Sequence, residues 1–107
     1  MPRQMPPDIE EKVVRKASLE LAIQTPKQYQ VILYNDDYTP MAFVVDVIQR
    51  IFHLKEDVAV RLMIQVHEEG RAVCGVFTHD VAETMVGLVN GYARLNQYPL
   101  LCEMEAV

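Results

Sequence analysis

A short apolar run that ends in polar acceptors, with an amphipathic segment directly after it, most constrains the fold of this chain. Residues 31–33 are Val-Ile-Leu and residues 35–37 are Asn-Asp-Asp. This order is typical of a buried strand that enters a turn. Residues 43–52 then repeat apolar side chains at helical spacing. Thr39-Pro40 marks the predicted helix start, because Thr accepts bonds from free amides and Pro suits the first helical position.

The regular pattern continues through the rest of the chain from Lys27 onward. The predicted elements are strands at 29–34, 72–77 and 99–104 and helices at 40–53, at 56–69 and from Thr78, which caps the third helix. Gly70 is the predicted stop of the second helix. Three strands and three helices in this order predict an α+β fold. We expect a two-layer α/β sandwich of order β-α-α-β-α-β, with a three-stranded sheet packed with three helices on one face.

The first part of the chain has a different composition. Residues 1–26 carry prolines near the start, a charged run and few large apolar side chains. Such a segment has little to bury. We therefore expect residues 1–26 to form a mobile N-terminal extension, transiently helical around residues 9–22, and residues 27–107 to form the single folded domain.

Charge and hydropathy exclude several classes of partner. The formal net charge is -5, and the ten basic residues are scattered along the 107-residue chain. A nucleic-acid-binding protein normally shows a clustered basic footprint, so we expect no nucleic-acid partner. No apolar stretch reaches membrane-spanning length and the N-terminus lacks the apolar segment of a secretory signal, so we expect no membrane partner and a cytoplasmic location. Cys74 and Cys102 lie in apolar runs and are expected to be buried and reduced; no metal site or cofactor is predicted.

Two sets of residues are candidates for binding chemistry. Asn35, Asp36 and Asp37 form either a solvated turn or a set of acceptors for one cation. His67 is either a partly exposed structural residue or an acceptor for an ammonium group, and it follows Met63 by one helical turn. An Asp36–His67 hydrolytic dyad is disfavoured, because no nucleophile motif accompanies it.

A third set is apolar and lies close to these polar residues in the sequence. Met41, Val44, Met63 and Val66 are typical of a core, although Met also suits binding surfaces because its side chain adapts its shape. Met41 lies on the first turn of its helix beside the acidic loop, where a core residue is less expected.

The residues Val-Ile-Leu-Tyr-Asn-Asp-Asp-Tyr-Thr-Pro-Met at 31–41 closely resemble the signature of the ClpS family, the bacterial adaptors of the ClpA-ClpP protease. Further segments that agree with the family are Val66-His67, Cys74–Thr78, Val81–Thr84, Tyr92–Arg94 and Pro99–Cys102. The resemblance covers residues 27–105. It implies a fold similar to the C-terminal domain of ribosomal protein L7/L12, in agreement with the sandwich expected from the pattern.

The resemblance implies an adaptor, not an enzyme. ClpS-like proteins bind N-end rule substrates whose first residue is Leu, Phe, Tyr or Trp, and deliver them to the AAA+ unfoldase ClpA. The recognised amino-terminal end of such a substrate is called the N-degron. By this resemblance, Asn35, Asp36 and His67 bind its amine and Asp37 lies near its second residue. The implied side-chain pocket consists of Thr39, Pro40, Met41, Val44, Met63, Val66 and Leu100.

One departure from the family concerns the partner protein. ClpS-like proteins dock on the ClpA N-terminal domain through an acid and a lysine of the third helix, which fall here on Asp80 and Met85. The loss of the lysine charge implies docking that is weaker, apolar or located elsewhere. The alternative interpretation is a structural or ribosome-associated α/β domain without a degron pocket. A peptide array with varied first residues distinguishes such a domain from an adaptor.

Overall fold

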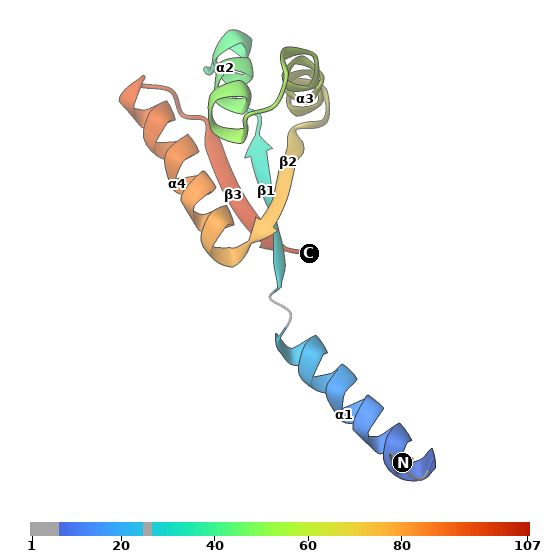
Figure 1. Ribbon diagram of the computed structural model, residues 1–107. Helices are drawn as coiled ribbons and strands as arrows, with labels where there is room; N and C mark the ends of the chain where they lie inside the picture. Colours follow the sequence, from blue (N-terminus) through green and yellow to red (C-terminus); the bar gives the residue numbers. More distant parts are fainter. Residues whose placement is uncertain (1–6, 25–26) are drawn as a thin grey trace.

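Three antiparallel strands and three helices form two layers, and a fourth helix precedes them (Figure 1). This computed structural model describes residues 7–24 and 27–107. The elements are α1 (Pro7–Gln24), β1 (Gln28–Tyr34), α2 (Met41–Phe52), α3 (Glu56–Glu69), β2 (Arg71–Thr78), α4 (His79–Leu95) and β3 (Leu101–Ala106). The predicted α+β sandwich and its order of elements are confirmed from β1 to β3, although the last strand begins two residues later than predicted.

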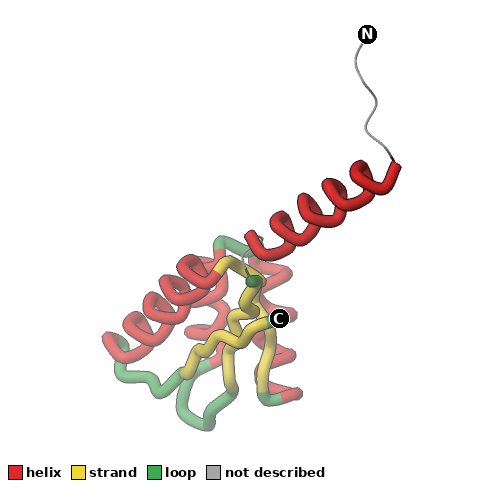
Figure 2. The backbone as a smooth tube through the Cα atoms, turned by 90° about the horizontal axis from the view of Figure 1, so that it is seen from below, coloured by secondary structure: helices red, strands yellow, loops and turns green. Residues whose placement is uncertain are grey.

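The strand β1 is the centre of the sheet, which has the order β2-β1-β3. Val31 pairs with Gly75 and Ile32 with Val73, so Cys74 is an extra residue that bulges β2. Helices α2, α3 and α4 lie over one face of the sheet, and Figure 2 shows the strands in the layer beside them. Side chains alternate across a strand, so Val31 and Leu33 point to the same face and belong to the core of the fold.

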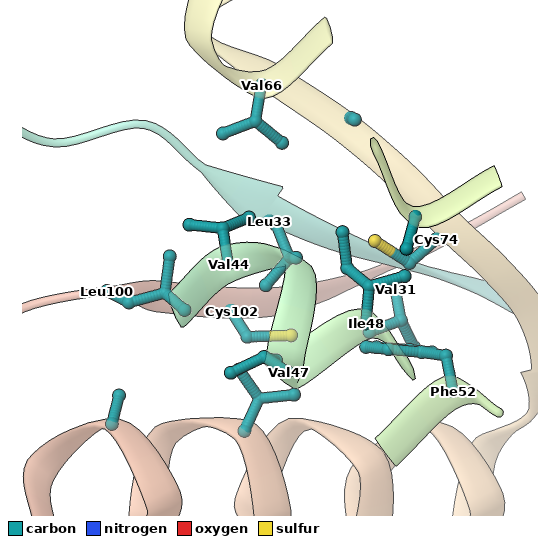
Figure 3. Close-up of a cluster of buried hydrophobic side chains, with 14 of the residues drawn as sticks. Val31, Leu33, Val44, Val47, Ile48, Phe52, Val66, Cys74, Leu100 and Cys102 are labelled. Carbon is teal, nitrogen blue, oxygen red and sulfur yellow. The ribbon is translucent and has the colours of Figure 1, made fainter. Parts of the chain in front are cut away.

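The core lies between β1 and helices α2 and α4 (Figure 3). Its largest fully buried side chains are Leu33, Ile48, Leu100, Val31, Val47 and Val89, and Phe52 is buried there as well. Cys74 and Cys102 are buried and free, as predicted. Burial raises the pKa of each thiol to about 12, so both remain protonated and behave as small apolar side chains.

The helix ends correct two predictions about capping. Gly70 does end α3, with a φ of 88° and its N–H donating to the Val66 carbonyl. Helix α2, however, begins at Met41, with Pro40 in extended geometry before it and no side-chain cap. The Thr39 hydroxyl donates to Asp36 instead of capping the helix. Thr78 precedes α4 as predicted, but its side chain also makes no capping bond.

Helix α1 extends away from the two layers in both views (Figures 1 and 2). The predicted transient helix at residues 9–22 lies within this longer helix, and every residue from 8 to 20 is exposed. Residues 1–6 and 25–26 of the predicted extension lie outside the described residues. Within the described parts of the chain, no helix is both long enough and apolar enough to cross a membrane.

Candidate binding pocket

The loop after β1 and the facing sides of α2 and α3 enclose a pocket of about 370 Å³. The residues that line it are Asn35, Asp36, Asp37, Tyr38, Thr39, Pro40, Met41, Val44, Met63, Val66 and His67. Small-molecule sites in proteins span about 300–1,000 Å³, so this pocket is large enough for one bulky side chain and its backbone atoms. The pocket therefore brings together residues from all three predicted candidate sets.

The shape of the loop depends on the carboxylate of Asp36. The backbone N–H groups of Tyr38 and Thr39 donate to its Oδ1 at 2.8 and 2.7 Å. The Thr39 hydroxyl donates to its Oδ2 at 2.7 Å. These local bonds are the ones that make Asp frequent in turns. They hold residues 36–39, including Asp37 of the rim, as one unit.

The same carboxylate is the charged centre of the pocket. Partial burial raises the pKa of Asp36, but the hydrogen bonds from Thr39 and Tyr38 and the charge of Arg94 outweigh this effect, and its pKa lies below 3.8. Asp36 is therefore ionised at neutral pH. A carboxylate has about four acceptor positions, so one remains after the three donors of the loop.

Apolar side chains form the inner part of the pocket. Val44 of α2 and Val66 of α3 are buried, and Met63 is half-buried between them and solvent. Met41 is 46 % exposed, which agrees with a position at the mouth of the pocket. His67 follows Met63 by one turn of α3 and is exposed at the polar rim. The pocket thus suits a ligand with a cationic, donor-rich end and an apolar body.

The structure brings together all but one of the residues assigned to degron binding. Leu100 does not line the pocket; it is 1 % exposed and lies in the core beside Val44 (Figure 3), so it supports the wall from behind. Tyr38 lines the pocket and is 80 % exposed, and the sequence analysis missed it. Its position in the sequence between Asp37 and Thr39, two predicted site residues, could have identified it. Asp80 and Met85 lie on α4, outside the pocket lining.

Two acidic side chains make the stability of the fold depend on pH. The pKa of Asp46, like that of Asp36, is lowered, because Asp46 accepts hydrogen bonds from Arg50 and Tyr92. A carboxylate whose pKa is lower in the folded chain binds fewer protons there than in the unfolded chain. Its contribution to stability is therefore complete above the ordinary value of 3.8 and lost as the pH falls through the folded-state pKa.

We expect the free energy of unfolding, measured with urea at a series of pH values, to fall as the pH drops below about 4. Asp36→Asn should flatten part of that fall, because the carboxamide does not titrate. If the free energy of unfolding falls equally at low pH in this variant and in the unmodified protein, Asp36 is not a source of the pH dependence.

Comparisons with known proteins agree with this geometry. A family model described as ATP-dependent Clp protease adaptor protein ClpS matches residues 24–103. Among solved structures, Agrobacterium tumefaciens ClpS2 bound to L-phenylalaninamide matches with a TM-score of 0.76 and 37 % sequence identity. The match covers 78 % of this chain and 100 % of that chain. The range matched by the family model includes every residue of the pocket.

Proposed function

The chain belongs to the ClpS family of Clp protease adaptors, and from this membership we propose that its pocket binds the first residue of proteins that begin with Leu, Phe, Tyr or Trp. The observation that carries the proposal is one pocket in which an ionised, acceptor-rich rim adjoins an apolar interior. A chain terminus with a bulky apolar side chain has the complementary pair of features.

The rim suits a free α-amino group. Such a group has a pKa of about 7.7–8.0 and is largely an ammonium with three donors at neutral pH. The side-chain oxygens of Asn35 and Asp36 and a neutral nitrogen of His67 would accept these three hydrogen bonds. A peptide nitrogen inside a chain has at most one hydrogen and no charge, so it leaves such a site unsatisfied. We therefore propose that the rim recognises the free amino terminus of the bound protein. Asp37, beside it, would lie near the second residue of that protein.

The interior suits the first side chain. Val44, Met63 and Val66 offer apolar contacts, and burying one large apolar side chain contributes about 1.5–3 kcal/mol. A hydrogen bond to a charged group contributes about 1.5–3 kcal/mol. The structurally similar ClpS2 was bound to L-phenylalaninamide, which joins a free amine to a benzyl side chain and blocks the carboxyl group as an amide. That ligand supports the same pairing of amine and side chain here.

The proposal is tested by fluorescence titration of a labelled peptide that begins with Leu, against the same peptide with an acetylated N-terminus. The free peptide is expected to bind with a Kd near or below about 1 μM, which corresponds to about -8.2 kcal/mol. The acetylated peptide should bind at least about 100-fold more weakly, because it has lost both the charge and two donors. Equal affinities would refute the proposed function.

Met41 is expected to control which first residues enter. It is a long side chain at the mouth of the pocket, and β-branched residues are widest next to the backbone. We predict that Met41→Ala admits peptides that begin with Ile or Val. The ratio of their Kd to the Kd of the Leu-ended peptide should fall by about tenfold. The measurement is a competition titration with peptides that differ only in the first residue, and an unchanged order of affinities would contradict the prediction.

We further propose that bound chains are delivered to the ClpA-ClpP protease through α4, where Asp80 and Met85 occupy the family's docking positions. Residues 1–26 are proposed to act in this transfer and not in peptide binding, in line with the exposure of residues 8–20. Removal of residues 2–25 should then leave the peptide Kd unchanged and slow degradation of a substrate by ClpA-ClpP. Undiminished degradation would remove this role from the extension.

A further inference from the structure

Arg94 connects the end of α4 to the segment that leads into β3. It lies in the last turn of α4, and its Nη1 donates to the carbonyl oxygens of Tyr98 and Leu100 at 2.6 and 2.9 Å. Two carbonyls of one short segment are thus fixed by a single guanidinium. Arginine suits this task because its planar group presents several donors in a rigid arrangement.

The segment held by Arg94 packs against the start of α2. The N–H of Tyr98 donates to the Ala93 carbonyl at 2.9 Å, and Gln97 adopts a φ of 63° to make the turn. The ring centroids of Tyr98 and Phe43 are 4.6 Å apart. Leu100, at the end of the segment, lies beside Val44 in the core (Figure 3). Phe43 and Val44 are consecutive residues of α2, so the segment supports the part of α2 that forms a wall of the pocket.

Arg94 also acts on the rim through its charge. Burial raises the pKa of Asp36, the hydrogen bonds from Thr39 and Tyr38 lower it, and the positive charge of Arg94 is the smallest of the influences that lower it. The other titratable groups that line the pocket with Asp36 are Asp37 and Tyr38 on the loop and His67 on α3. Arg94 does not line the pocket itself, so it makes no direct contact with a ligand there.

We propose that Arg94 is a positioning residue for recognition of the first residue: it fixes Leu100 behind Val44 and places a positive charge close to the Asp36 loop. The inference rests on the proposed function, because it assigns a role in the same pocket.

The test compares Arg94→Met, which removes both effects, with Arg94→Lys, which keeps the charge. Each full-length variant is titrated with the Leu-ended peptide and its acetylated form, and the pKa of the Asp36 carboxyl is followed by carbon NMR. Arg61→Met is the matched control, because Arg61 is an exposed arginine of α3 whose partner is Asp57. It should change neither quantity.

Arg94→Met is expected to bind the free peptide about tenfold more weakly, equivalent to about 1.4 kcal/mol, because the lost support of the pocket wall outweighs the lost repulsion between the guanidinium and the bound ammonium. It is also expected to raise the pKa of Asp36. Arg94→Lys is expected to keep the wild-type Asp36 pKa and to lose about threefold in affinity, since an ammonium is a point charge without the fork of a guanidinium. If Arg94→Met does not fold, the peptide affinity and the Asp36 pKa of Arg94→Lys still test the inference.

Wild-type affinity in Arg94→Met, or in Arg94→Lys, would overturn the inference. Lost affinity with an unchanged Asp36 pKa in Arg94→Met would also overturn it, because a purely structural role gives that result. Failure of the proposed function is distinguishable, since the unmodified protein would then bind the free and acetylated peptides equally.

Discussion

Asp36→Ala is expected to weaken binding of a Leu-ended peptide by at least about 100-fold, equivalent to about 2.7 kcal/mol. The carboxylate is an ionised group of the pocket, and an ammonium that loses a charged acceptor loses about 1.5–3 kcal/mol. The substitution also removes the acceptor of three donors, namely the N–H groups of Tyr38 and Thr39 and the Thr39 hydroxyl. These bonds then no longer hold residues 36–39 together. Isothermal titration with the peptide measures the combined loss.

Two variants separate the effects of charge and loop geometry. Asp36→Asn keeps an oxygen that can accept from both N–H groups but removes the charge, so it should lose affinity while the loop stays ordered. Asp57→Ala removes one negative charge from an exposed position on α3 and should leave the affinity unchanged. Retention of wild-type affinity by Asp36→Ala would mean that this carboxylate has no part in the site.

Ile48→Ala is expected to lower the free energy of unfolding by about 2–5 kcal/mol. Ile48 is 0 % exposed and is one of the largest fully buried side chains. The truncation removes buried methyl and methylene groups and leaves a cavity, because the strand β1 and the helices around it relax only partly. Domains of this size have a total stability of about 5–15 kcal/mol, so the loss is a large fraction of it. Urea unfolding followed by circular dichroism measures the change.

The matched control for this prediction is Ile64→Ala. Ile64 lies on α3 and is 43 % exposed, so the same truncation removes fewer buried contacts and should cost less than about 1 kcal/mol. Equal costs for the two isoleucines would contradict the core described for this fold. Because the core holds Val44 in place, Ile48→Ala should also weaken peptide binding at temperatures near its lowered midpoint of unfolding.

The order of strands and helices could be predicted because it depends on local patterns. Apolar side chains at strand and helix spacing identified all six elements from β1 to β3. Gly70 could be identified as a helix end because a positive φ favours glycine. Thr39 was misinterpreted because two local roles compete for one hydroxyl, and in the fold the carboxylate of Asp36 takes it.

Spacing within one helix also predicted part of the pocket. Met63 and His67 are four residues apart, so they had to share a face of α3, and the structure places both in the pocket lining. The resemblance to the ClpS family assigned functions to these residues. It also assigned Leu100 to the pocket, whereas the structure buries that side chain behind the lining.

The sequence alone determined the elements, their order and the acidic turn, because these follow from the preferences of neighbouring residues. Only the tertiary structure decided that Leu100 stands behind Val44 and that Arg94 acts on the Asp36 loop. The sequence shows no basic residue beside that loop. The end of α4 turns back toward α2, where Tyr98 packs against Phe43, and such long-range proximity depends on how helices pack, which no local pattern encodes.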